Sequence, residues 1–190
     1  MNTARALRSL RVSPMRRRHL KAVLEIEEKV YPRPWSYQLY RRELAMPEDR
    51  RIYLVARTDE AVVGYAGLMF AAEDGHVTTV AVDPQYQRQG VGIRVFLVLV
   101  KTAIDHGAKH LTLEARVANV GAQALYRRFG FEDAGIRKGY YQATGEDALI
   151  MWANDVDTVE YEAKLEDIER SLGDVVRVDR VGTEFERLAV

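Results

Sequence analysis

The sequence contains no cysteine among its 190 residues. That absence excludes a disulfide scaffold, a zinc site with thiolate ligands and catalysis through a cysteine nucleophile. Long apolar runs are also missing, since none approaches the roughly 20 residues that cross a bilayer. Aromatic residues make up 9% of the chain and charged residues 29%, which are ordinary globular values. We therefore expect a soluble, cytoplasmic protein with one domain, or one domain and an appendage.

Serine and histidine are scarce. None of the serines lies in a Gly-x-Ser-x-Gly segment, which excludes the nucleophile elbow of α/β hydrolases. Of the four histidines, only His106 and His110 have a spacing of four residues, and Gly107 should end the helix between them. We therefore expect no metal site. The glycines of the QRQGVG segment fit neither a Walker loop nor GxGxxG, which disfavours ATP and nicotinamide chemistry.

Hydrophobic periodicity predicts a mixed α/β protein. The predicted elements are strands at 10–12, 52–56, 61–70, 77–82, 110–115, 131–135 and 148–152, and helices at 16–30, from Ser36 to about Ala45, from the QRQGVG segment to Gly107, and at 119–129. A loop that contains Tyr140 and Tyr141 joins the last two strands. This order predicts a mixed sheet with helices packed on both faces.

The charge is balanced overall but uneven along the chain. Residues 1–51 carry 13 basic and 6 acidic residues, whereas residues 154–190 carry 5 and 11. We expect a domain at 1–153 and an acidic, helical C-terminal extension at 154–190. One face of the predicted helix is apolar, so it either covers its own domain or binds a partner or a second copy. A basic segment such as the start of this chain is more often a solvated surface than a nucleic-acid site. We therefore expect no direct nucleic-acid binding.

The QRQGVG segment combines polar residues and glycines directly after a strand and at the start of an apolar helix. Glycines let the backbone approach a ligand closely. The first N–H groups of a helix have no intrahelical partner, and the helix dipole favours negative charge there. The segment therefore indicates a phosphate or pyrophosphate site at Arg88, Gly90 and Gly92, unless the glycines serve only to start the helix.

Several segments in order resemble the GNAT superfamily of N-acetyltransferases: VAVDPQYQRQGVG, an apolar helix, and LTLEARVANVGAQALYRRFGF. PWS near the start and GYY followed by GEDALIM resemble, more narrowly, the ribosomal-protein-alanine N-acetyltransferases of the RimI family. The resemblance covers roughly residues 11–152. It implies a mostly antiparallel central sheet and acetyl transfer from acetyl-coenzyme A to the N-terminal α-amine of a protein, such as the N-terminal alanine of a small-subunit ribosomal protein.

The resemblance also implies residues for the coenzyme. Val80, Ala81 and Val82 would pair with the pantetheine arm, unless they form a plain core strand. The pyrophosphate would be held mainly by backbone N–H groups of Arg88, Gln89, Gly90, Val91, Gly92 and Ile93, so the side chain at position 93 should matter little. Asn119 would bond the coenzyme, cap the next helix, or do both.

For the chemistry, the resemblance implies Glu114 as general base and Tyr126 as the acid that assists the departing thiolate. By itself, an acid on an alternating strand is usually solvent-facing, and a helix tyrosine is usually a packing residue. Trp35, Tyr140 and Tyr141 would bind the acceptor, since aromatic residues on loops can wall a narrow slot. No metal is implied.

Three other functions stay open from the sequence. In the first, the acceptor is a small amine such as a polyamine or antibiotic, which requires an acidic, open site. In the second, the acceptor is a protein lysine, which requires stronger deprotonation. In the third, the chain is a coenzyme-binding module whose acidic helix docks a partner.

Overall fold

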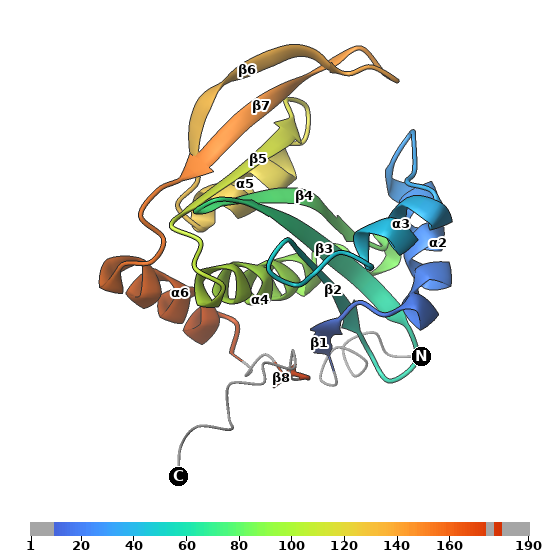
Figure 1. Ribbon diagram of the computed structural model, residues 1–190, viewed down its shortest axis with the longest axis horizontal. Coiled ribbons are helices and arrows are strands. Elements are labelled where there is room, and N and C mark those ends of the chain that lie inside the picture. Colours follow the sequence, from blue (N-terminus) through green and yellow to red (C-terminus); the bar gives the residue numbers. More distant parts are fainter. Residues whose placement is uncertain (1–9, 174–176, 180–190) are drawn as a thin grey trace.

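The computed structural model describes residues 10–173 and 177–179, which build one eight-stranded sheet (Figure 1). The strand order is β6-β7-β5-β4-β3-β2-β1-β8. The strands are β1 (Arg11–Pro14), β2 (Arg51–Arg57), β3 (Val62–Ala71), β4 (Asp74–Val82), β5 (His110–Arg116), β6 (Glu132–Tyr141), β7 (Glu146–Ala153) and β8 (Arg177–Val178). All neighbours are antiparallel except the pairs β4–β5 and β1–β8. The mixed, mostly antiparallel sheet expected from the sequence is confirmed.

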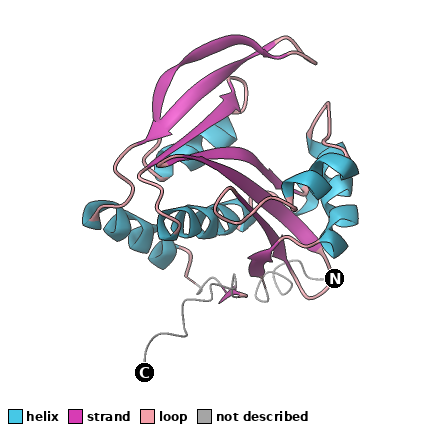
Figure 2. Cartoon of the chain, viewed as in Figure 1, coloured by secondary structure: helices cyan, strands magenta, loops and turns pink. Residues whose placement is uncertain are grey.

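Helices cover both faces of the sheet (Figure 2). They are α2 (Leu20–Val30), α3 (Tyr37–Glu43), α4 (Val91–Asp105), α5 (Val120–Arg128) and α6 (Val159–Ser171). Side chains of α4, α5 and α6 share one core cluster with the sheet, and those of α2 and α3 share a second. None of the helices in the described ranges is long and apolar enough to cross a membrane.

Local sequence signals explain most helix boundaries. Ser36 caps α3 by accepting a hydrogen bond from the backbone N–H of Leu39 at 3.1 Å. Gly90 and Gly107 flank α4 with φ angles of +80° and +90°, which glycine adopts without steric cost. Pro32 and Pro34 separate α2 from α3, because neither can donate a backbone hydrogen bond.

Three details differ from the sequence-based expectation. The segment at 16–30 begins with a 3₁₀ turn, Arg17–His19, before α2. Strand β6 continues to Tyr141, which pairs with Glu146, so the paired tyrosines end a strand rather than occupy a loop. The short strand β8 was not expected at all, since two residues carry no periodic signal.

The sheet is open at its centre. Strands β4 and β5 are in register only where Asp74–Val77 lies beside His110–Leu113. A β-bulge in the β3–β4 pairing, next to Gly67, bends β4 away from β5 beyond that point. The two parallel strands therefore diverge toward their C-terminal ends and leave a gap in the middle of the sheet.

The acidic helix α6 packs against the domain's core. Its side chains Tyr161, Leu165 and Ile168 are all at most 6% exposed and belong to the core cluster of α4. The Tyr161 hydroxyl also donates a 2.8 Å hydrogen bond to the carbonyl of Phe129. Burial of each such side chain contributes about 1.5–3 kcal/mol. The helix thus covers its own domain, and the boundary at residues 153 and 154 stays a prediction.

Candidate active site

A cavity of about 480 Å³ occupies the gap between β4 and β5. Asn119, Ala122 and Tyr126 line it on the face of α5, whereas Tyr31 and His76 line it on the face of α2. Because its walls come from both faces, the cavity connects the two sides of the sheet. A smaller hollow of about 90 Å³ lies under α3 and contains none of the site residues expected from the sequence.

The backbone of β4 supplies one wall of this gap. Val80 and Val82 lie opposite Ala66 and Gly64 of β3. The N–H of Asp83 donates to the carbonyl of Val63, which places the two valines at the alternate, non-bonded positions of the ladder. Their backbone N–H groups therefore point away from β3 into the gap. Only the backbone of Ala81 faces β3.

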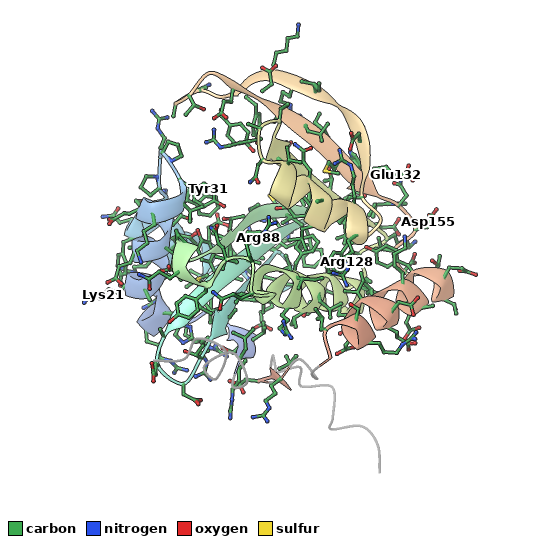
Figure 3. The ribbon with its side chains drawn as sticks, turned by 180° about the vertical axis from the view of Figure 1, so that it is seen from behind. Lys21, Tyr31, Arg88, Arg128, Glu132 and Asp155 are labelled. Carbon is green, nitrogen blue, oxygen red and sulfur yellow. The ribbon has the colours of Figure 1, made fainter. Side chains whose placement is uncertain are left out.

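The loop before α4 presents a second set of donors. Arg88 and Gly90 both have positive φ angles, +60° and +80°. The side chain of Gln89 donates to the carbonyl of Gln85 at 2.8 Å, so it closes the loop on itself. The backbone N–H groups from Arg88 to Ile93 make no hydrogen bond to another described residue. Figure 3 shows Arg88 in this loop and Tyr31 at the end of α2.

These donors fit the pyrophosphate and pantetheine of acetyl-coenzyme A. The loop offers backbone N–H groups and the positive end of the 15-residue helix α4 to an anion. Close approach is possible because Gly92 carries no side chain beside Val82, where a Cβ would lie 3.5 Å from Val82 Cγ2. The Ile93 side chain, by contrast, is only 9% exposed and lies in the core. The expectation that this side chain matters little for holding the coenzyme stays a prediction, whereas its burial means that it does matter for packing.

Asn119 performs the structural role considered for it. Its side-chain oxygen accepts the backbone N–H of Ala122 at 3.1 Å and thereby caps α5. Since Asn119 also lines the cavity, its amide nitrogen stays available to a ligand there.

Glu114 lies on β5 with its side chain only 10% exposed. One oxygen, Oε1, accepts a hydrogen bond from Arg137 Nη1 at 3.2 Å. The other, Oε2, lies 3.1 Å from His76 Nε2. The Tyr141 hydroxyl donates to the backbone carbonyl of Glu114 at 3.2 Å. A poorly solvated carboxylate therefore faces the cavity between two nitrogen groups.

Tyr126 lies on α5 and is 8% exposed. It packs against Phe96, with ring centroids 5.2 Å apart, and its hydroxyl has no hydrogen-bond partner in the described part of the chain. Burial raises the pKa of this phenol well above its usual value. The hydroxyl therefore keeps its proton and is suited to donate a hydrogen bond into the cavity.

The aromatic residues expected at the acceptor side do line the cavity. Trp35 stacks obliquely on Tyr40, with centroids 5.2 Å apart. Arg116 lies over the ring of Tyr141, with its central carbon 4.2 Å from the centroid, and burial raises the pKa of that phenol to about 12. Tyr140 is 40% exposed at the rim. The structure thus brings all three expected residues to the same cavity.

Sequence reasoning missed Tyr31. Its hydroxyl donates to the carbonyl of Val80 at 3.0 Å and lies 3.3 Å from the Thr79 hydroxyl. Burial raises its pKa to about 12. Tyr31 thereby fixes the end of α2 to the edge of the gap. A tyrosine just before a proline gave no recognisable signal in the sequence.

Glu27 was also missed, although it left a signal. This charged residue occupies an apolar position of α2 and is 1% exposed. Its carboxylate accepts hydrogen bonds from the hydroxyls of Tyr40, at 2.6 Å, and Tyr65, and from the Trp35 backbone N–H at 2.8 Å. A buried carboxylate with three donors holds the loop that carries Trp35.

Fold and site together define an acetyltransferase. The sequence profile of the acetyltransferase (GNAT) family matches residues 20–131, and the chain belongs to that family. The enzyme class expected from the sequence, an N-acetyltransferase, is confirmed.

Individual relatives have names that state a more specific activity than the family does. A Mycobacterium tuberculosis protein named N-alpha-acetyltransferase RimI is 37% identical over 135 residues, covering 68% of this chain and 82% of that protein. A [ribosomal protein bS18]-alanine N-acetyltransferase of Escherichia coli is 31% identical over 142 residues, covering 74% and 94%. A Bacillus subtilis protein named as a candidate for the same activity is 37% identical over 152 residues, covering 80% and 97%.

Solved structures agree. The ribosomal-protein-S18-alanine N-acetyltransferase of Escherichia coli superposes with a TM-score of 0.69 at 30% identity, covering 77% of this chain and 94% of that one. A Salmonella typhimurium acetyltransferase that was solved with acetyl-coenzyme A has a TM-score of 0.67 at 17% identity, covering 80% and 96%. The second likeness concerns the fold alone.

Proposed function

We propose that this protein transfers the acetyl group of acetyl-coenzyme A to the N-terminal α-amine of a protein, namely the N-terminal alanine of a small-subunit ribosomal protein. The observation that carries the proposal is the position of Glu114. Its carboxylate faces a cavity that joins a coenzyme-sized gap to an aromatic acceptor side. The names of the relatives in Mycobacterium tuberculosis and Escherichia coli support the choice of acceptor. Such an enzyme works in the cytoplasm, where ribosomal proteins are made.

Acetyl-coenzyme A supplies an activated thioester. The N–H groups of Val80 and Val82 hold the pantetheine arm beside β4, as the alternation of the ladder allows. The loop from Arg88 to Ile93 holds the pyrophosphate. A backbone N–H of β4 that faces the gap is also suited to stabilise negative charge on a carbonyl oxygen.

Glu114 accepts the proton of the attacking amine, directly or through one water molecule. An α-amine, with an ordinary pKa near 7.7–8.0, needs little help at neutral pH, whereas a lysine amine near 10.4 needs far more. One carboxylate is therefore adequate for a protein N-terminus. Tyr126 donates a hydrogen bond to the sulfur, which departs as a thiolate, and keeps its own proton.

The charges around the acceptor side disfavour a polyamine. Arg33 and Arg116 line the cavity there, and Arg137 contacts the Glu114 carboxylate. The carboxylate of Glu27 already accepts three hydrogen bonds, and the carboxylate of Glu114 already contacts Arg137 and His76, so neither is free to bind a cationic acceptor. A multiply charged cation would meet like charges at this wall, which is unfavourable.

The test is acetyl-coenzyme A turnover with three kinds of acceptor: short peptides with a free N-terminal alanine, N-terminally blocked lysine peptides, and spermidine. We expect turnover on the free N-termini alone. Glu114→Gln, which preserves shape but removes the base, should lower kcat by about 10²–10⁴-fold, while the Kd for acetyl-coenzyme A stays unchanged. Turnover confined to spermidine or blocked lysine peptides would overturn the acceptor, and full activity of Glu114→Gln would overturn the base.

A further inference from the structure

We propose that His76 is a positioning residue for Glu114: it holds the carboxylate from β4 while Arg137 holds it from β6. The inference rests on the proposed function of Glu114 and assigns a role to a residue that neither the sequence pattern nor the chemistry of acetyl transfer had singled out. Histidine is rare in this chain, with four copies. His76 is the only histidine among the residues that line the cavity.

The placement of His76 follows from strand register. His76 lies beside Thr112, within the four residue pairs that still join β4 to β5. Side chains alternate along a strand, so His76 and Glu114 both point to the α2 face while Val77 and Leu113 enter the opposite core. His76 thus stands where the sheet begins to open, next to the carboxylate.

Each carboxylate oxygen of Glu114 contacts a nitrogen from a different strand. Nε2 of His76 lies 3.1 Å from Oε2, and Nη1 of Arg137 donates to Oε1 at 3.2 Å. The His76 side chain is 23% exposed, against 10% for Glu114. A carboxylate held at both oxygens cannot rotate freely about its last torsion, so its basic lone pairs keep one direction toward the cavity. Arg137 alone is a weaker restraint, because its side chain is 53% exposed.

The charge environment of Glu114 comes from several elements. The titratable or charged groups around it are His76 on β4, Arg116 on β5, Arg137, Tyr140 and Tyr141 on β6, Glu27 on α2, and Tyr31 and Arg33 in the segment after α2. Across the pairing with β7 the neighbour is apolar, Ile150. Of these groups, the imidazole of His76 and the guanidinium of Arg137 are the two that contact the carboxylate oxygens.

Two substitutions separate the hydrogen bond of His76 from the volume of its side chain. His76→Gln keeps an amide nitrogen that can donate to Oε2, and His76→Leu keeps the volume but removes the donor. We expect His76→Leu to lower kcat on an N-terminal alanine peptide about tenfold at pH 7.5. His76→Gln should recover most of that rate. The KM for acetyl-coenzyme A should not change in either variant.

The pH profile of kcat/KM provides a readout that a merely structural role would not move. Loss of a hydrogen-bond donor makes the charged form of a carboxyl less favourable. The acidic limb should therefore move to higher pH in His76→Leu and stay in place in His76→Gln, which keeps a donor. An unchanged acidic limb in His76→Leu would overturn the proposal, as would equal rates of wild type and His76→Leu at pH 7.5.

A second measurement needs no acceptor. The NMR chemical shift of the Glu114 carboxyl carbon at pH 7.5 should differ between wild-type protein and His76→Leu and return toward the wild-type value in His76→Gln. The same chemical shift in all three proteins would refute the proposal even if the acceptor peptide proved wrong. A changed chemical shift in a protein that acetylates no N-terminus would instead refute only the proposed function. Thermal unfolding of both variants controls for loss of the fold.

Discussion

At the scale of single residues, burial raises the pKa of the tyrosine hydroxyls around the cavity and keeps them protonated. Tyr126 illustrates this effect most clearly. A free phenol has a pKa near 10 and a thiol near 8.5, so full proton donation to a leaving thiolate is already uphill. Burial raises the pKa of Tyr126 further. The structure therefore favours a hydrogen bond from Tyr126 over complete proton transfer.

This difference predicts a modest effect for Tyr126→Phe. A hydrogen bond to a charged group contributes roughly 1.5–3 kcal/mol, so kcat should fall about 10- to 100-fold. The basic limb of the pH profile should stay where it is, because the phenol does not titrate in the working range. Steady-state kinetics between pH 6 and 9.5 measure both quantities. A basic limb that disappears in Tyr126→Phe would show that the phenol does release its proton.

At the scale of elements, the order of strands and helices was predictable because periodicity, prolines and caps marked nearly every boundary. Ser36, Asn119 and Gly107 act as the sequence suggested. The gap between β4 and β5 could not be predicted from the sequence, because the bulge beside Gly67 depends on how β3 and β4 pair. His76 could not be connected to Glu114 for the same reason: only register places two residues 38 positions apart in contact.

The loop before α4 yields a prediction with a matched control. A Cβ at Gly90 would lie 2.3 Å from Nη1 of Arg94, which donates to the Gly90 carbonyl. Gly107, at the other end of α4, has a similar φ angle and open space around it. We expect Gly90→Ala and Gly107→Ala to lose comparable stability, about 1–2 kcal/mol from the left-handed backbone.

Only Gly90→Ala should weaken acetyl-coenzyme A binding, by about tenfold, because a shift of the loop misdirects its N–H groups. Isothermal titration calorimetry measures the Kd, and urea unfolding measures the stability. Equal loss of affinity in both variants would mean that the loop is not where the coenzyme binds.

At the scale of the whole molecule, α6 is part of the core that supports the site. Leu165→Ala removes a side chain that is 2% exposed and should lower the free energy of unfolding by about 2–5 kcal/mol. Val159→Ala, on the same helix at 76% exposure, should change it by less than about 0.5 kcal/mol. Denaturant titrations of the two variants test this. Similar values for both would show that α6 is docked only loosely.

Two partly buried tyrosines make the stability of the fold sensitive to alkali. Burial raises the pKa of Tyr31 and of Tyr141 to about 12, from an ordinary value near 10. The unfolded chain therefore releases these protons first as the pH rises. Stability is fully present below pH 10 and is lost between about pH 10 and 12, by up to ~1.4 kcal/mol per pH unit for each tyrosine.

Urea unfolding at pH 8 to 11 measures this slope directly. Tyr31→Phe should reduce the slope by the contribution of one proton, although it also removes the bond to the Val80 carbonyl. A stability that does not depend on pH above 10 would contradict the burial of these phenols.

The gap between β4 and β5 also has a mechanical consequence. Four residue pairs join the half of the sheet that contains β1 to β4 to the half that contains β5 to β7. Few ladder hydrogen bonds cross this line, so we expect the sheet to bend there more easily than along its other strand pairs. The proposed coenzyme gap lies at the open end of the same line, and a molecule bound in it would bridge the two halves and reduce that bending. The part of the sheet that deforms most easily and the proposed reaction site thus coincide.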